Sequence, residues 1–196
     1  MNQNQPQNQL LNQIRASHAP KHSSGFLRFF ELSRWILLII MLIYIVYLFI
    51  FTLFVVSGPS MEPNFHDKEV LVVNKASYWF KKPQRGDVVI FYFPGQREVK
   101  YIKRIIGVPG DNIEIRNQHF YINGQYLTDY TPTSYPTEVL IKGKNSWVVG
   151  EGEYFVSGDN RPNSNDSRVW DSLSASEIIG KVDLRFYPFD KVGGVE

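Results

Sequence analysis

The feature that most constrains the fold is a run of 22 residues from Trp35 to Val56 without a single charged side chain. As a helix with a rise of about 1.5 Å per residue it spans roughly 33 Å, enough for a bilayer hydrocarbon core of about 30 Å. A buried helix of a soluble domain is the alternative, but such a helix rarely runs this long without a polar face. A cleavable signal peptide has a shorter apolar core that ends in small residues, and Phe54-Val55-Val56 offers no such site. We therefore predict an uncleaved transmembrane anchor over residues 35–56.

The charges on either side of this run predict its orientation. Four basic residues and one acid precede it: Arg15, Lys21, Arg28, Arg34 and Glu31. Three acids and one base follow it: Glu62, Asp67, Glu69 and Lys68. The positive-inside rule then places residues 1–34 in the cytoplasm as a disordered, basic tail, with residues 1–24 rich in Asn, Gln, Ser and Pro. Residues 57–196 are expected to form an extracytoplasmic domain of a single-pass plasma-membrane protein.

The domain over residues 57–196 has the pattern of a mainly β fold. Short apolar runs typical of strands occur at 70–73, 88–93, 101–108, 147–149, 154–156 and 182–186. Asn123-Gly124, between residues 120–122 and 125–127, predicts a two-residue hairpin turn. Ser174 to Glu177 forms a capping box that predicts one short helix, stopped by Gly180. Residues 128–146, with two prolines, are expected to form a long loop.

Composition excludes several kinds of site. The chain has no cysteine, so disulfides, thiolate nucleophiles and cysteine-based zinc sites are excluded. Its four histidines show no metal-ligand spacing, and we expect no metal. A formal net charge of +2 gives no reason to expect a nucleic-acid partner.

A candidate nucleophile lies just after the apolar run. Ser60 follows Val56 by four residues, in a segment that Gly58, Pro59 and Pro63 stiffen. A catalytic serine needs a base, and the only histidines of this domain, His66 and His119, lack surroundings that indicate a triad. A neutral lysine can take the place of histidine.

The best lysine for that role is Lys103. On an extended strand it shares a face with Tyr101 and Ile105, and loss of solvation there favours the neutral amine. Its pKa would have to fall from about 10.4 to about 7–8 for catalysis near neutral pH. The segment alone favours a lysine that reaches solvent at a strand edge. A basic phosphate-binding stretch is a further interpretation, but the interleaved Ile and Tyr residues argue for a half-buried strand.

A third polar cluster occupies residues 158–168, with two aspartates, two arginines and two serines. Asx-type turns would hold it together as a self-hydrogen-bonded loop. Without further context it could also be an ordinary polar surface turn.

Taken together and in order, these segments resemble the sequence boxes of type I signal peptidases, in the compact form of that family. The boxes are Ser60-Met61-x-Pro63, Gly86-Asp87-Val88-Val89-Ile90-Phe91, Tyr101-Ile102-Lys103-Arg104 with Gly107 to Asp111, and Gly158 to Arg168. The resemblance covers the chain from the anchor to about Pro188. It implies a mainly β catalytic domain of two packed antiparallel sheets behind a single N-terminal transmembrane helix.

The resemblance also implies residue roles. Ser60 would be the nucleophile and oxyanion donor through its backbone N–H, Lys103 the general base, and Ser164 the hydroxyl that orients the lysine. The residues implied to hold the polar cluster against the lysine strand are Asp159, Arg161, Asp166, Arg168 and Arg104. The residues implied to wall shallow apolar substrate pockets are Met61, Phe65, Tyr101 and Ile102. Two positions are of note: Gly58 stands where some members carry an oxyanion-binding serine and others glycine, and Asn64 stands where threonine is usual.

The implied activity is that of a membrane-bound serine endopeptidase without cofactor, which removes signal peptides from exported preproteins at A-x-A-like sites. Its implied partners are those signal peptides and the lipid bilayer. Two alternatives stay open at this stage. Another Ser–Lys protease, such as a self-cleaving repressor, would need a DNA-binding module, and residues 1–34 hold no such pattern. An inactive anchored β module would be expected to have lost Ser60 or Lys103, and both are present.

Overall fold

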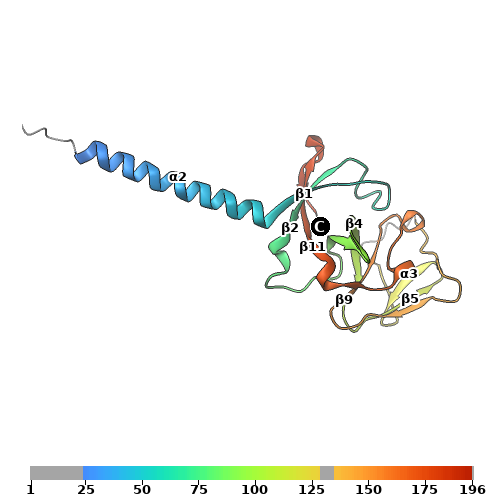
Figure 1. Cartoon of the computed structure of the whole chain (residues 1–196). Helices are drawn as coiled ribbons and strands as arrows, with labels where there is room; N and C mark the ends of the chain where they lie inside the picture. Colours follow the sequence, from blue (N-terminus) through green and yellow to red (C-terminus); the bar gives the residue numbers. More distant parts are fainter. Residues whose placement is uncertain (1–23, 129–134, 196) are drawn as a thin grey trace, which may run out of the picture. The chain divides into compact units, whose positions relative to one another are not determined.

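The computed structural model describes residues 24–128 and 135–195, and Figure 1 traces their elements. The predicted disorder of residues 1–24 concerns a segment that lies outside the described residues, except for Ser24. The chain falls into two compact units, one that ends at Ile45 and one that begins at Val46.

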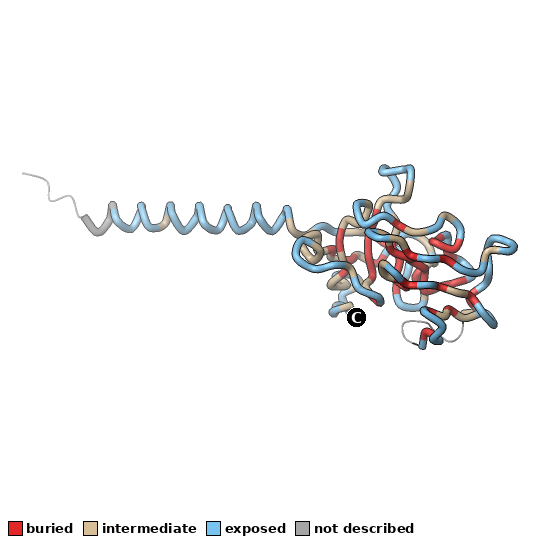
Figure 2. Tube along the Cα trace, turned by 90° about the horizontal axis from the view of Figure 1, so that it is seen from below, coloured by how far each residue is buried: buried red, intermediate tan, exposed pale blue. Residues whose placement is uncertain are grey.

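Helix α2 runs over Ser24–Ile50 and contains most of the predicted anchor. Its segment Arg28–Ile50 has a mean hydropathy of 2.3, and among residues 24–128 and 135–195 it is the one helix long and apolar enough to cross a membrane. Its described side chains are nearly all exposed, as the pale colour of the helix in Figure 2 shows. The helix begins at Ser24 and not at Trp35, so residues 24–34 of the predicted tail are helical.

The end of the predicted anchor is wrong in one respect: residues 51–55 are a strand. Strand β1 (Phe51–Val55) pairs antiparallel with β2 (Val70–Asn74), from Phe51 opposite Asn74 to Val55 opposite Val70. An uncharged apolar segment is compatible with a helix or a strand, and β-branched and aromatic residues such as Val55 and Phe54 favour the strand where a partner is available.

Most strands belong to one large antiparallel sheet. Its order is β1-β2-β11-β3-β4-β9-β10, and β12 pairs with β11. The bounds of its other strands are β3 Val88–Phe93, β4 Gln96–Gly107, β9 Glu153–Ser157, β10 Leu173–Ser174, β11 Ile178–Tyr187 and β12 Gly193–Gly194. The runs predicted at 70–73, 88–93, 101–108, 154–156 and 182–186 all lie on these strands or overlap them. Strand β4 lies between β3 and β9, which makes its second half a central strand.

A smaller antiparallel sheet has the order β7-β6-β5-β8. Its strands are β5 Asn112–Arg116, β6 His119–Ile122, β7 Gln125–Tyr126 and β8 Ser146–Val148. The predicted hairpin turn is confirmed, because Asn123 and Gly124 both have the positive φ, 51° and 81°, that a two-residue turn of type I′ requires. Strand β5 was not among the predicted strands.

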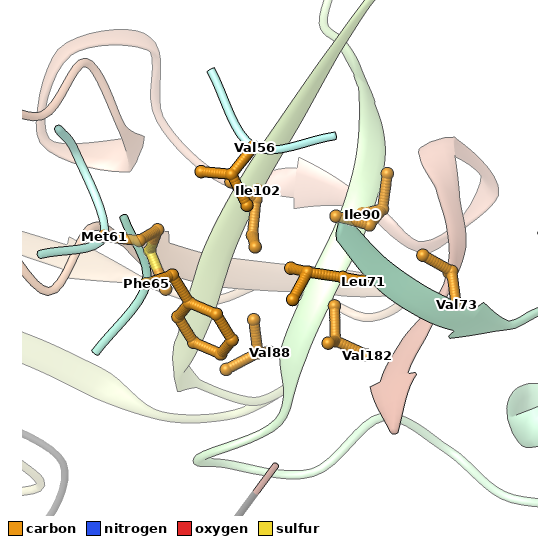
Figure 3. Close-up of a cluster of buried hydrophobic side chains, with 9 residues drawn as sticks. All are labelled: Val56, Met61, Phe65, Leu71, Val73, Val88, Ile90, Ile102 and Val182. Carbon is orange, nitrogen blue, oxygen red and sulfur yellow. The ribbon is translucent and has the colours of Figure 1, made fainter. Parts of the chain in front are cut away.

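The two sheets pack against each other through a shared apolar cluster. Ile106 of β4 and Phe155 of β9 come from the large sheet, and Ile113 of β5 and Phe120 of β6 come from the small one. A second cluster, shown in Figure 3, joins β2, β3, β4 and β11 to Val56, Met61 and Phe65 of the segment after β1. The predicted architecture of two packed antiparallel sheets is therefore confirmed.

Helical structure after β1 is limited to short turns among the described residues. They are η1 (Lys75–Tyr78), η2 (Arg161–Asn163), α3 (Ser167–Trp170), η3 (Ala175–Glu177) and η4 (Phe189–Lys191). The helix predicted from the capping box is a single 3-10 turn, in which the Ser174 hydroxyl accepts from the Ser176 N–H. Ile178 already begins β11. Gly180 does not end a helix: it lies in β11, where a Cβ would come within 2.5 Å of the Asn74 carbonyl oxygen. Of the predicted loop over 128–146, the described residues before Ser146 contain no helix or strand.

Candidate active site

Ser60 lies in the segment between β1 and β2, residues 57–68, which we call the serine loop. Two backbone bonds close its ends: the Val56 N–H donates to Glu69 O at 2.8 Å, and the Lys68 N–H donates to Val56 O at 2.9 Å. The Gly58 N–H donates to the Asp67 carboxylate at 2.9 Å. Gly58 has a φ of +85°, a backbone conformation that glycine adopts without strain. The loop is thus fixed to the same strands that form the large sheet.

Lys103 lies on β4 and is brought directly against Ser60. Its Nζ donates to Ser60 Oγ at 2.7 Å and to the Ile102 carbonyl oxygen at 3.0 Å. The residue is buried, with 3% of its surface exposed. Its Nζ also lies 5.4 Å from the centre of the Tyr101 ring.

The surroundings of Lys103 favour its neutral form. Burial lowers the pKa of Lys103 from 10.5 to about 8, since a charged amine loses its hydration there. Asp166 and Asp159 oppose this effect and raise the pKa, while Arg168 lowers it. Near pH 8 a large fraction of the amine is therefore neutral and has a lone pair to accept the Ser60 proton.

The polar cluster of residues 158–168, hereafter the polar loop, begins where β9 ends. Because Ser157 of β9 pairs with Arg104 of β4, the next residues fall beside the arginine. The Arg104 Nε and Nη2 donate to the two oxygens of Asp159, each at 2.9 Å, and its Nη1 donates to Gly86 O at 2.9 Å. Both members of this ion pair are buried, at 4% and 0% side-chain exposure. The pair connects the polar loop to the residue next to Lys103.

A second buried ion pair lies within the polar loop. The Arg168 Nε and Nη2 donate to Asp166 at 2.8 and 2.9 Å, and the Ser157 hydroxyl donates to the same carboxylate at 2.9 Å. Burial would raise the pKa of Asp166, but the hydrogen bond and charge of Arg168 outweigh it and hold that pKa below its usual value. Asp166 therefore stays ionised, and its negative charge acts on Lys103.

Arg161 ties the polar loop to the small sheet. Its Nη1 donates to the Thr137 hydroxyl at 3.0 Å, and its guanidinium lies 4.6 Å from the centre of the Phe120 ring. Its Nε and Nη2 are buried and have no hydrogen-bond partner within the described ranges. Burial lowers the pKa of Arg161 to about 10.

Ser164 and Gly158 meet the serine loop. The Ser164 hydroxyl accepts from the Gly158 N–H at 3.1 Å, and the described residues show no hydrogen bond from it to Lys103. A Cβ on Gly158 would lie 2.4 Å from both Ser164 Oγ and the Ser60 carbonyl oxygen. Sequence reasoning did not single out Gly158; its place at the start of the polar loop was the only available signal.

A groove of about 370 Å³ opens over Ser60 and Lys103. Tyr101 and Ile102, two of the four residues implied to wall substrate pockets, are among its lining residues. Met61 and Phe65 are not: they are 0% and 2% exposed and pack in the core cluster that includes Ile102 (Figure 3). These two apolar side chains thus support the groove from the core side instead of lining it.

Comparison with known proteins identifies the family. The model of the family "Signal peptidase, peptidase S26" matches residues 29–187. Signal peptidase IB of Staphylococcus aureus (strain N315) is 35% identical over 178 residues, which cover 82% of this chain and 92% of that protein. Signal peptidase I P of Bacillus subtilis subsp. natto is 34% identical over 164 residues, which cover 80% and 88%.

Among solved structures, a signal peptidase I of Enterococcus faecalis V583 is 36% identical, with a TM-score of 0.42 over 52% of this chain and 97% of that one. The extent of the family match and the identity to curated relatives are sufficient for the assignment. The chain belongs to the signal peptidase family, peptidase S26, and is a signal peptidase I.

Proposed function

We propose that Ser60 and Lys103 are the nucleophile and general base with which this signal peptidase cuts signal peptides from exported preproteins. The observation that carries the proposal is the 2.7 Å distance from Lys103 Nζ to Ser60 Oγ in a buried setting. A lysine with a pKa of about 8 can be neutral at the pH of catalysis and accept a proton.

The reaction then follows acyl transfer. Neutral Lys103 takes the Ser60 proton as Oγ bonds to the scissile carbonyl carbon. The tetrahedral intermediate collapses, the peptide C–N bond breaks, and the lysine ammonium gives its proton to the leaving amine. Water, deprotonated by Lys103, attacks the acyl-enzyme ester. The bond to Ser60 Oγ then breaks, the lysine ammonium returns its proton to that oxygen, and the signal peptide leaves with a new C-terminal carboxyl group.

An oxyanion forms in each of the two tetrahedral intermediates of this reaction, and it needs hydrogen-bond donors. The Ser60 backbone N–H has no partner among the described residues, so it is available for that role. Gly58 offers no side-chain donor, and its own N–H is occupied by Asp67. The polar loop supports this geometry through the Asn160 N–H, which donates to the Ser60 carbonyl oxygen at 3.1 Å.

The substrate is proposed to lie extended along β4. Strand β9 pairs with β4 only at Arg104, Ile105 and Gly107, so the β4 segment before Arg104 has no strand on that side among the described residues. Val99, Tyr101 and Ile102 of this segment line the groove. An added strand would form main-chain bonds there, and the shallow groove would accept small residues at the first and third positions before the cut.

Helix α2 is proposed to be the single membrane anchor of the protein. Its flanking charges support a cytoplasmic N-terminus and an extracytoplasmic catalytic domain, which includes strand β1 from Phe51 onward. The anchor would confine enzyme and preprotein to one surface, which raises their effective concentration.

The test is cleavage of a preprotein by the full-length chain in detergent. Ser60→Ala and Lys103→Ala should each lower the rate by at least about 10³-fold, because nucleophile and base act as one unit. Lys103→Arg should be equally inactive, since a guanidinium stays protonated. Ser146→Ala and Lys142→Ala, exposed positions outside the groove, serve as matched controls. Full activity of Ser60→Ala or Lys103→Ala would rule out the dyad.

The cleavage site is tested with preproteins that carry Ala, Val, Leu or Asp at the first position before the cut. Overpacking of a shallow pocket costs about 1–3 kcal/mol, which corresponds to a rate loss of roughly 5- to 150-fold for Leu. Equal rates for Ala and Leu would contradict the preference for small residues without affecting the dyad.

A further inference from the structure

Asn64, where the family resemblance leads one to expect threonine, reaches a buried carboxylate. Its Nδ2 donates to Asp159 Oδ2 at 2.8 Å. Asn64 itself is exposed, whereas Asp159 is 0% exposed. The same carboxylate accepts two bonds from Arg104, so the Asn64 amide completes a set of three side-chain donors around it.

This bond links the two halves of the proposed dyad. Asn64 lies in the serine loop, four residues after Ser60. Asp159 is bound to Arg104, the neighbour of Lys103 on β4, and is one of the two carboxylates whose charge acts on Lys103. The amide bond therefore joins the segment that carries the nucleophile to the ion pair beside the base.

The backbone of Asn64 is also held in place. The Arg185 Nη2 of β11 donates to the Asn64 backbone carbonyl oxygen. The Arg185 guanidinium lies 5.3 Å from the centre of the Phe65 ring and pairs with Glu69, whose Oε2 is 2.9 Å from its Nε. Glu69 is buried and follows the end of the serine loop directly. The backbone at Asn64 is thus fixed by β11 while its side chain is aimed at Asp159.

We infer that Asn64 is a positioning residue for the reaction: its amide clamps the serine loop to the Asp159–Arg104 pair and thereby sets the separation of Ser60 and Lys103. This inference rests on the proposed dyad. Asn64 lies outside the groove lining, so it acts through Ser60 and not on the substrate.

The inference predicts an effect on turnover more than on binding. Asn64→Leu keeps the approximate shape but removes the donor, which frees the serine loop from Asp159. A displacement of the reacting groups by about 1 Å can cost about 10²-fold in rate. We expect kcat to fall by roughly 10- to 100-fold while KM stays within about twofold, since the groove residues are untouched. Asn64→Gln, which keeps the amide on a longer side chain, should recover part of the loss.

A second readout is the pH dependence of kcat/KM, which reports the pKa of Lys103 in the free enzyme. The charged groups that act on Lys103 are Asp166, Asp159 and Arg168. Asn64→Asp adds a negative charge beside Asp159, and negative charge favours the ammonium form of the lysine. The rise of activity with pH should therefore move to higher pH in Asn64→Asp, and stay in place in Asn64→Gln.

The experiment measures kcat, KM and the pH profile of the full-length chain in detergent with a preprotein substrate. Asn145→Leu, the same change at an exposed asparagine before β8 that has no side-chain bond among the described residues, is the control and should match the parent protein. If Asn64→Leu does not fold, Asn64→Asp and Asn64→Gln decide the question by the same two readouts.

The inference is overturned if Asn64→Leu keeps kcat within twofold of the parent, or if the pH profile of Asn64→Asp is unshifted. Its failure is distinguishable from failure of the dyad. If Lys103→Ala is active, the proposed dyad is contradicted. If Lys103→Ala is inactive and Asn64→Leu has normal activity, only the role of Asn64 is contradicted.

Discussion

Replacement of Gly158 by alanine tests how closely the polar loop and the serine loop depend on each other. The constraint at Gly158 is room and not backbone conformation, because its φ is not positive. An added Cβ would stand 2.4 Å from the Ser60 carbonyl oxygen, 2.4 Å from Ser164 Oγ and 2.7 Å from Ser164 Cβ. One of these neighbours is backbone, so a rotamer change cannot relieve all the contacts.

The size of the effect follows from these distances. An ordinary contact with Cβ begins at 3.4 Å, so the Ser60 carbonyl must retreat by 1.0 Å, the difference between 3.4 and 2.4 Å. A shift of about 1 Å in a reacting group can lower the rate by about 10²-fold. Overpacking of this kind costs about 1–3 kcal/mol of folding free energy. We therefore expect Gly158→Ala to lose about 10²-fold in kcat while the protein still folds.

The assay is preprotein cleavage under substrate saturation, together with thermal unfolding. Gly193→Ala is the matched control, since a Cβ at Gly193 would meet nothing within 4 Å and its φ is not positive. A folded Gly158→Ala variant with kcat within twofold of the parent would refute the reasoning. Such a result would mean that the polar loop shifts to make room for the added Cβ while Ser60 keeps its position.

Three further predictions concern the charges and hydroxyls of the site. If Lys103 acts as the neutral amine, as proposed, kcat/KM should rise with pH and reach half its maximum near the Lys103 pKa of about 8; a profile that falls over this range would exclude the lysine as base. Arg168→Met should lower the free energy of unfolding by about 3–5 kcal/mol in chemical unfolding, because it leaves the Asp166 carboxylate buried without its ion-pair partner. Arg161→Met should lower that free energy clearly less, because two of the Arg161 nitrogens have no hydrogen-bond partner within the described residues. Equal losses for the two arginine variants would contradict this order. Ser164→Ala should lower kcat by roughly tenfold or less without moving the pH profile, since Asp166 still accepts from the Gly158 N–H; complete inactivity would give Ser164 a larger role.

Strand pattern and motif order were sufficient to predict the mainly β architecture. The Asn123-Gly124 turn was predictable because its chemistry is local: two residues with positive φ between short strands. Strand β1 was not, because hydrophobicity does not distinguish a helix from a strand at residues 51–55. That choice depends on β2, whose pairing partners lie 15 to 23 positions further along the chain.

The site shows the same division between local and non-local information. Ser60, Lys103 and the polar loop could be named from residue types and from family resemblance. The sequence could not tell that Met61 and Phe65 point into the core, because an apolar side chain is equally suited to a pocket wall and to a core. Nor could it reveal the close approach at Gly158, which depends on how β9 aligns with β4.

Strand β1 has a practical consequence for any soluble version of the enzyme. It is the outermost strand of the large sheet, and Phe54 packs against the core cluster of Val56 and Met61. A cut after Val56 would strip that strand and leave the N–H and C=O groups of β2 open to pairing with other molecules, which promotes aggregation. A cut before Phe51 keeps the sheet complete. Leu53 and Val55 would still present 62% and 57% of their surface to water, so even the correctly trimmed enzyme should require detergent to stay dispersed.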